Sequence, residues 1–296
     1  MTLGLALALA SILSLGQAQG PSTTAAAAAS CPAPADLLPV SPAVFDASSL
    51  TLVRCTQADL DAGRWVAADA RLLSASRSAL LIADDASRRA WQAVIARLAA
   101  RRAIDAGRWT TSAQAVLPHE EALPWAGPLV RGLSSARAAW AAQDAALLAQ
   151  ARRELDVLNG LARDVGAVSD AELARLVVQG AVAGAQYERD EMQLLMESAR
   201  DVATRLDDGD ERRVRVVLPR EQQADLLRVT DRYAAAAEIY REILAAEPAR
   251  VQSRVGLADA YRRLGYAKEA GIALDQARVL WSGADPEAAA LLTSGR

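Results

Sequence analysis

The feature that most constrains the fold is a 34-residue period near the C-terminus, within residues 224–281. A period of this length, with small and aromatic residues at fixed places, is typical of a helix–turn–helix unit. Such a unit buries its apolar face only by stacking on a neighbouring copy, and the stack forms a curved surface that usually binds other proteins. The recurring pairs are Ala224 and Ala258, Asp225 and Asp259, Leu227 and Tyr261, Arg228 and Arg262, Ala236 and Ala270, and Tyr240 and Leu274.

Several positions of the two copies also match a known pattern of small and aromatic residues. They are Tyr233, Ala236, Tyr240 and Pro248 in the first copy, and Leu257, Ala258, Tyr261, Gly265, Ala270 and Ala277 in the second. On these residues the segment 217–284 resembles the tetratricopeptide repeat family. Both copies depart from the family at its Trp position, which holds Arg220 and Arg254, and the second copy lacks the closing Pro. The resemblance implies a solenoid of helical hairpins that acts as a binding scaffold, and it names no partner.

The resemblance also implies which residues face a partner, because the family's concave surface is lined by fixed positions of each first helix. Asp225 matches Asp259 and Arg228 matches Arg262, which predicts a ladder of charges suited to peptide groups and charged side chains. The alternative is that Asp and Arg residues three apart pair with each other on a solvated helix. The predicted groove positions are Leu218, Glu221, Asp225, Arg228 and Val229, then Gln252, Val255, Asp259, Arg262 and Arg263.

The composition favours an all-α fold. The 296-residue chain has a single Phe, and much of its hydrophobic content is alanine. Alanine has the highest helix propensity and lets helices approach closely. The formal net charge is −3, whereas nucleic-acid binding needs a basic face, so we expect no nucleic-acid partner.

The N-terminus has the pattern of a secretory signal peptide. Residues 3–15 are apolar and uncharged, and small residues at Gly16 and Ala18 predict cleavage after Ala18, so that the mature chain begins at Gln19. The apolar run is too short to span a bilayer. We therefore expect an exported protein of a bacterial cell envelope, periplasmic or extracellular, with no integral membrane segment once the signal is removed.

The two cysteines, Cys31 and Cys55, predict a disulfide bond in an exported chain. Closing the loop between them would stabilise the fold by about 3–4 kcal/mol in the chain-entropy model. Two alternatives remain open at this point. The thiols are both free, or Cys31 carries a lipid, because Ala28 to Cys31 faintly resembles a lipobox.

The pattern along the chain predicts four parts. They are a signal peptide at 1–18, an Ala/Ser/Pro-rich tether at 19–49, a helical-hairpin region at 50–208 and the repeat region with a terminal capping helix at 217–296. A six-residue motif, Leu60 to Trp65, recurs as Ile104 to Trp109 and predicts degenerate helical hairpins in this region. The alternative is a coincidence between two helix C-terminal turns, where Gly is the favoured residue. Expected helices are 85–104, 129–141, 144–164, 169–183 and 187–206, with a proline-rich loop at 118–128 and a short β-like stretch at 214–218.

No catalytic pattern was found, so we expect a protein that is not an enzyme and that needs no cofactor or metal. The single histidine, His119, precedes Glu120 and Glu121, a grouping that could serve acid–base chemistry but more often forms an exposed loop. The acidic run 207–211 has carboxylates that calcium prefers, but its spacing does not match an EF-hand. Trp125, in the proline-rich loop, is expected to be exposed.

The sequence thus predicts an exported scaffold that binds a protein or peptide in a concave helical groove. The alternative is a periplasmic assembly factor or chaperone that holds exported clients transiently. A scaffold should purify with one stoichiometric partner, whereas a chaperone should suppress the aggregation of several clients.

Overall fold

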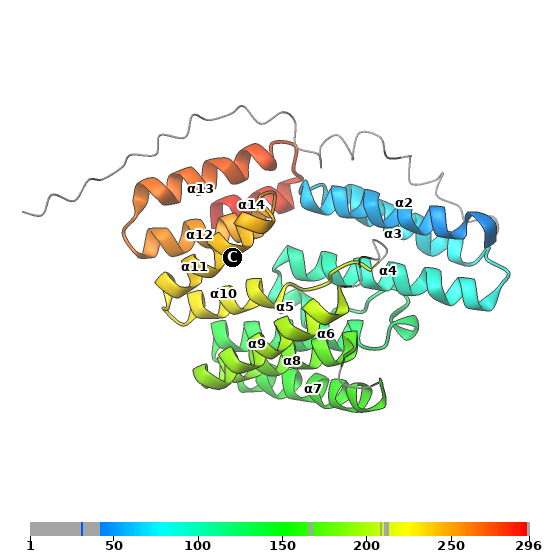
Figure 1. Ribbon diagram of the computed structural model, residues 1–296, viewed down its shortest axis with the longest axis horizontal. Coiled ribbons are helices and arrows are strands. Elements are labelled where there is room, and N and C mark those ends of the chain that lie inside the picture. Colours follow the sequence, from blue (N-terminus) through cyan, green and yellow to red (C-terminus); the bar gives the residue numbers. More distant parts are fainter. Residues whose placement is uncertain (1–30, 32–41, 166–167, 208, 210–212, 295–296) are drawn as a thin grey trace, which may run out of the picture.

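The structure is a computed structural model that describes residues 31, 42–165, 168–207, 209 and 213–294. All regular structure in this part of the chain is helical (Figure 1), which confirms the all-α prediction. The β-like stretch 214–218 has no strand partner within the described residues, so the expectation of a strand is wrong. The predicted signal peptide and cleavage site, and most of the predicted tether, lie outside the described residues.

Helices that follow one another in the chain pack against one another. Among the pairs formed in this way are α6 with α7, α8 with α9, α10 with α11 and α12 with α13, whose bounds are given below. The first helix of the described residues begins at Pro42, inside the segment that was expected to be a tether. The elements are α2 (Pro42–Asp61), α3 (Trp65–Ala79), α4 (Asp85–Ala106), α5 (Trp109–Ser112), η2 (Glu120–Ala122), α6 (Ala126–Ala142), α7 (Ala145–Val165), α8 (Asp170–Ala185), α9 (Arg189–Leu206), α10 (Pro219–Val229), α11 (Tyr233–Ala246), α12 (Val251–Arg263), α13 (Ala267–Leu280) and α14 (Pro286–Ser294).

Local sequence signals set several of the helix ends. The side chain of Ser169 accepts a hydrogen bond from the Glu172 backbone N–H at 3.1 Å and so caps α8 as predicted. Pro219 is the first residue of α10, where its missing N–H costs nothing. Gly63 and Gly107 have φ angles of 70° and 63°, so the recurring six-residue motif closes two helices with the same left-handed turn.

The apolar core contains side chains of nearly every helix. Trp91 is fully buried and its indole N–H donates to the Ala75 carbonyl at 2.9 Å. Trp125 is also buried, with 9% of its surface exposed, so the expectation that it is exposed is wrong. Ala236 is fully buried on α11, whereas its counterpart Ala270 on α13 is only half-buried.

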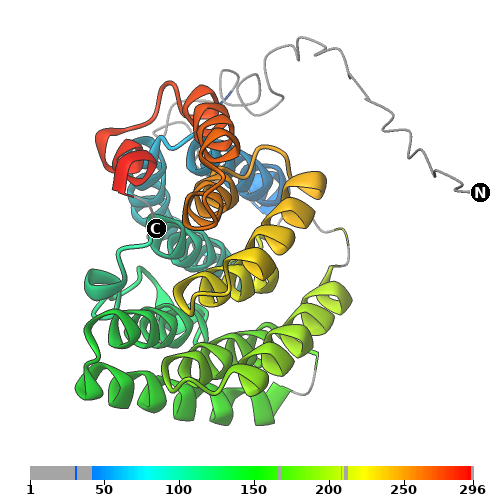
Figure 2. The ribbon, with the colours of Figure 1, turned by 90° about the vertical axis from the view of Figure 1, so that its left-hand side faces the viewer.

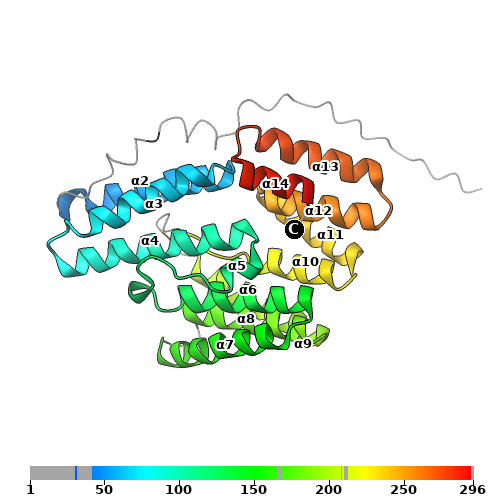
Figure 3. The same ribbon diagram turned by 180° about the vertical axis from the view of Figure 1, so that it is seen from behind.

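A second, smaller core joins the two ends of the described chain. Viewed from the side, the helices follow an arc that brings α2 and α3 beside α13 and α14 (Figure 2), and the view from behind agrees (Figure 3). Trp65 of α3 and Trp281 pack edge to face with ring centres 5.8 Å apart. The Trp281 indole N–H donates to the Asp61 carbonyl at 2.9 Å, and the Asp285 N–H donates to the Gly63 carbonyl at 3.0 Å. The first hairpin and the last helices therefore close on each other.

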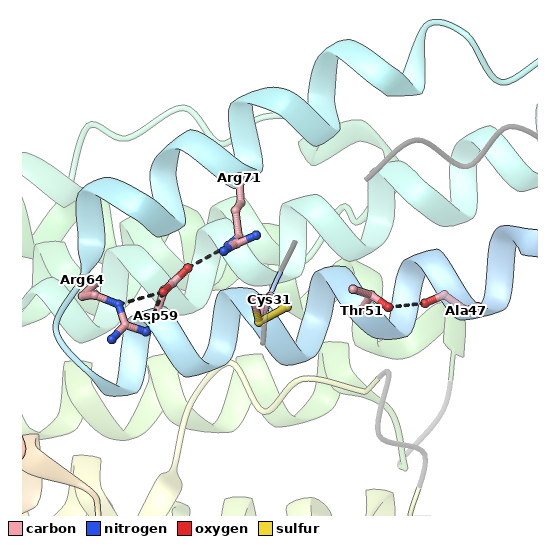
Figure 4. The surroundings of a disulfide bond; sticks show 7 residues. Cys31, Ala47, Thr51, Asp59, Arg64 and Arg71 are labelled. Atoms are coloured by element: carbon pink, nitrogen blue, oxygen red, sulfur yellow. Dashed lines mark hydrogen bonds and ion pairs between the residues drawn. A yellow bond between two sulfur atoms is a disulfide. The ribbon is translucent and has the colours of Figure 1, made fainter. Parts of the chain in front are cut away.

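Cys31 is bonded to Cys55, which confirms the predicted disulfide (Figure 4). The bond holds residue 31 against α2, where Cys55 is buried. Further along α2, the buried carboxylate of Asp59 accepts from Arg64 at 2.8 Å and from Arg71 at 2.8 Å, which ties α2 to α3. In the described part of the chain, no helix combines the length and the apolar character needed to cross a membrane.

Candidate functional site

The predicted groove residue Asp225 lies in the interior of the molecule. It is fully buried on α10 and accepts hydrogen bonds from the Tyr240 hydroxyl and from Arg137 at 3.2 Å. Arg137 comes from α6, and its guanidinium lies 4.8 Å from the centre of the Trp109 ring. Burial and the charge of Asp225 raise the pKa of Tyr240 well above its usual value, so the phenol stays protonated and donates.

Glu221, one helical turn earlier, is also enclosed by the chain itself. It accepts from Arg250 at 2.7 Å and from the Ser253 hydroxyl at 2.7 Å. Arg250 pairs as well with Asp105 of α4, at 2.7 Å. Burial favours the neutral form of Arg250, but the two carboxylates outweigh it and raise its pKa, so the guanidinium remains charged. This network ties α4, α10 and the start of α12 together.

The predicted Asp and Arg ladder takes a mixed form. Arg228 of the first copy pairs with Asp259 of the second at 2.7 Å, and Asp259 also accepts from Arg262 at 2.6 Å. The alternative of pairing three residues apart therefore holds for Asp259 and Arg262. Burial would raise the pKa of Asp259, but Arg228 and Arg262 hold it below the usual value. Arg262 and Arg263 are exposed.

Half of the ten predicted groove positions are therefore buried and do not line an open groove in this structure. Leu218 borders the cavity described next, and Val229 is half-buried. Arg137 of α6 reaches Asp225, and Asp105 of α4 reaches the network of Glu221 through Arg250, whereas Arg228 is enclosed by its pair with Asp259. The buried groove positions are Glu221, Asp225, Arg228, Gln252 and Val255.

A cavity of about 330 Å³ lies elsewhere, between the C-terminal halves of α9 and α11. Its origin is the connection from α9 to α10, residues 207–218, which is much longer than the connection 247–250 from α11 to α12. The extended end of this connection, residues 213–218, borders the cavity over its whole length. We call this space the α9–α11 cavity. Its volume is within the range of sites that bind small molecules.

The interior of the α9–α11 cavity is apolar and its mouth is charged. Trp125 and Leu129 form part of its buried floor, and Ala203 of α9 and Ile243 and Ala246 of α11 border it from the two sides. Apolar walls with a few polar groups are typical of a binding site. The remaining lining residues are Arg97, Asp170, Leu173, Ala174, Arg200, Thr204, Leu206, Asp207, Arg213, Val214, Arg215, Val216, Val217, Leu218, Pro219, Arg220, Glu242 and Glu247.

Asp170 anchors the connection at the edge of the cavity. Its carboxylate pairs with Arg97 of α4 at 2.8 Å and with Arg213 of the connection at 3.2 Å. Arg97 also lies 5.0 Å from the centre of the Trp125 ring. Burial alone would raise the pKa of Asp170, but the hydrogen bonds and charges of the two arginines hold it below its usual value. The segment after residue 213 is thereby held against α4 and α8.

The charged side chains at the mouth of the cavity form ion pairs with one another, and a partner's charged groups could replace one member of each pair. Arg215 pairs with Asp207 at 2.8 Å and with Glu247 at 3.1 Å, and Arg220 pairs with Glu242. The side chain of Arg215 is 58% exposed. Exposed pairs of this kind contribute only about 0–1 kcal/mol, so replacing them with a partner's charges costs little.

Sequence reasoning missed this cavity. It identified residues 214–218 as β-like from their composition but gave them no role, and it placed Trp125 at the surface. The signal available in the sequence was the alternation of Arg213, Val214, Arg215 and Val216, shortly before Pro219. Alternation predicts one buried and one exposed face, and therefore a segment that packs across other elements.

The other candidates for chemistry form no site in the structure. His119 has a φ of 56° and lies 3.6 Å from Glu121, and Glu120 accepts from Arg131 at 3.0 Å. Among the described residues, no group of His, Cys, Asp and Glu is arranged to hold a metal ion. Most of the acidic run 207–211 lies outside the described residues.

Comparisons of the chain with protein-family models, with curated proteins and with solved structures found no match.

Proposed function

We propose that this protein is an exported binding module, a solenoid of tetratricopeptide-like hairpins that holds a partner protein at the α9–α11 cavity. The observation that carries the proposal is the cavity itself, an apolar space of about 330 Å³ with a charged mouth between two helices. An apolar side chain of a partner would fill the interior of the cavity. Charged residues of the partner next to that side chain would replace one member of each exposed ion pair at the mouth.

The repeat architecture is supported by the places where the period falls. Its first copy coincides with α10 and α11, and its second with α12 and α13. Helix α10 packs on α12, and α11 packs on α12, as stacked hairpins require. Binding at the concave face of these hairpins would first require Asp225, Glu221 and Arg228 to leave their buried partners, so the open cavity is the better site.

Export is supported by the bond between Cys31 and Cys55. Disulfides persist in oxidising compartments and are rare in the cytosol. The apolar run at residues 3–15 supplies a route for export. Both features are consistent with a partner in the cell envelope.

The test is recovery of the partner by purified protein from native envelope extract, compared between two variants of α9. Ala203→Trp places an indole in the cavity mouth, and Leu194→Trp places the same group on a surface position that is 64% exposed. We expect one stoichiometric partner with the wild-type protein and with Leu194→Trp, and its loss with Ala203→Trp. Full recovery with Ala203→Trp, while circular dichroism shows both variants folded, contradicts the proposal.

The chaperone alternative has a distinct outcome in the same experiment. Several unrelated clients would bind in substoichiometric amounts, and the protein would suppress their aggregation. Exposed apolar side chains on α3, at Val66 and Leu73, and that of Leu80 directly after it would offer such clients a surface.

A further inference from the structure

An apolar stripe that no other part of the described chain covers runs along α3. Val66, Leu73 and Leu80 are 68%, 56% and 78% exposed, and each is seven residues from the next. Seven residues are close to two turns of an α-helix, so the three side chains lie on one face. Leu80 directly follows α3 and keeps right-handed helical backbone angles, with a φ of −68° and a ψ of −19°, so the spacing holds to the end of the stripe.

The stripe is accessible because other faces of α3 make its contacts with the molecule. The buried apolar side chains of α3 are Trp65, Ala68, Leu72, Ala75 and Ala79. A row of exposed apolar side chains marks a surface that binds another molecule. Apolar residues that recur every seven positions are the pattern by which one helix packs along another. The stripe therefore calls for a second helix.

The stripe is complementary to a second copy of itself that runs in the opposite direction. Val66 lies seven residues before Leu73 and Leu80 seven residues after it, so an antiparallel copy centred on Leu73 places apolar side chains against each other at both ends. Asp69 and Arg77 lie four residues before and after Leu73. In the same arrangement, Asp69 of each copy lies at the level of Arg77 of the other. A two-fold interface requires such self-complementarity, since both copies offer the same surface.

The two charged side chains are available for this pairing. Arg77 is exposed, and its guanidinium has no partner among the residues that the structure describes. Asp69 is 53% exposed, and its contacts with Arg102 are 3.3 Å long. Burial raises the pKa of Asp69 and Arg102 offsets this only in part, so the carboxylate is incompletely stabilised within its own copy. A parallel copy would instead place Asp69 beside Asp69 and Arg77 beside Arg77, where like charges repel.

We propose that two copies of this protein associate through α3, with the two helices antiparallel and centred on Leu73, and with Asp69 of each copy beside Arg77 of the other. A seam of one helix from each copy is smaller than the interfaces of stable complexes, so the dimer forms in a concentration-dependent way. No residue of α3 borders the α9–α11 cavity, so each copy keeps its cavity in the dimer. Two cavities in one dimer would raise the avidity for a partner that carries two binding segments.

Sedimentation velocity of the full-length protein over a series of concentrations measures the association. Leu73→Glu places two carboxylates at the centre of the seam, and Leu194→Glu is the matched control on α9, at a position that is 64% exposed. We expect a dimer of the wild-type protein, a dissociation constant at least tenfold higher for Leu73→Glu, and a change of less than threefold for Leu194→Glu. Both substitutions are at exposed positions, so both variants should fold, which circular dichroism checks.

Cysteine crosslinking tests the direction of the two helices. The native cysteines are bonded to each other, so a cysteine introduced on α3 supplies the only free thiol. Val66→Cys and Leu80→Cys proteins, one of them carrying a mass tag, are mixed and mildly oxidised, and non-reducing electrophoresis separates the products. Antiparallel pairing predicts mainly the product that joins position 66 to position 80. Leu194→Cys, mixed and oxidised in the same way, should give no crosslinked dimer.

Three results would overturn the inference. They are a wild-type protein that stays monomeric at about 0.5 mM, equal effects of Leu73→Glu and Leu194→Glu, and crosslinks that mainly join 66 to 66 and 80 to 80. If the wild-type protein is monomeric while Leu73→Glu abolishes its binding to phospholipid vesicles or to unfolded clients, another occupant covers the stripe and self-association is wrong.

Discussion

Gly256 is the residue whose size matters most to the buried polar interior. A methyl group at this position of α12 would overlap the ring of Tyr240, which is fully buried and donates its hydroxyl proton to Asp225. The absence of a side chain therefore lets α11 and α12 approach while Tyr240 reaches α10. Glycine elsewhere in a helix costs stability, so its place here is explained by packing.

We expect Gly256→Ala to lower the free energy of unfolding by about 2–3 kcal/mol, because the methyl group forces the Tyr240 ring from its bond with Asp225. Gly271 of α13 is the matched control, since a methyl group there meets no atom within 4 Å. Gly271→Ala should raise the free energy of unfolding by about 0.5–1 kcal/mol through helix propensity. Urea unfolding of both variants decides it, and changes of the same sign would contradict the packing described.

Asp170 gives the protein a dependence on pH. Its folded-state pKa is lower than the unfolded value of about 3.9, so its pairs with Arg97 and Arg213 stabilise fully above that value. The stabilisation is lost as the pH falls through the folded-state pKa. We expect Asp170→Asn to cost about 1–2 kcal/mol at pH 7, since it breaks a largely buried pair at the N-terminus of α8. Urea unfolding should show this difference shrinking below about pH 4; a difference that stays constant to pH 3 contradicts the assignment.

At the scale of single elements, local sequence predicted where many helices begin and end. Ser169 caps α8, and Gly63 and Gly107 close helices, because these positions depend only on neighbouring residues. The start of α3 is different. Its own N-terminal residues supply no side-chain cap, and the Val66 N–H donates instead to the Asp285 carboxylate at 2.6 Å. No local pattern could have predicted a cap from the other end of the chain.

This cap gives a test of the closure between the first and last elements. Asp285→Ala should lower the free energy of unfolding by about 1 kcal/mol, the usual cost of losing a helix cap. The control is Asp275→Ala, which removes an exposed carboxylate whose partner among the described residues is Arg278, and which should change stability by less than about 0.5 kcal/mol. Thermal unfolding of the two variants compares them directly, and equal losses would argue against the cap.

At the scale of the whole molecule, sequence predicted the helical class and the disulfide but neither the closure nor the α9–α11 cavity. Both depend on residues far apart in the chain. Asp225 was recognised from the repeat, but its partner Arg137 lies in α6, outside any repeat pattern. Arg137 of α6 therefore covers Asp225, a position that the period alone would have left facing an open groove.

Because α2 and α3 pack against the segment of Trp281, we expect that destabilising one end of the described chain also destabilises the other. Trp281 is buried between them, and Trp281→Ala should cost about 3–5 kcal/mol, as for other buried aromatic side chains. Hydrogen exchange should then accelerate both at the Asp61–Trp65 turn and in α13. Faster exchange in α13 alone would show that the ends do not stabilise each other.

The central claim is that a partner protein occupies the α9–α11 cavity, and site-specific photo-crosslinking in native envelopes tests it most directly. A benzophenone amino acid replaces Ala203 at the cavity in one variant and Leu194, on the exposed face of the same helix, in the other. The account predicts one discrete crosslinked product from position 203 and none from position 194. The same product from position 194, or none from position 203 in a folded variant, would contradict it.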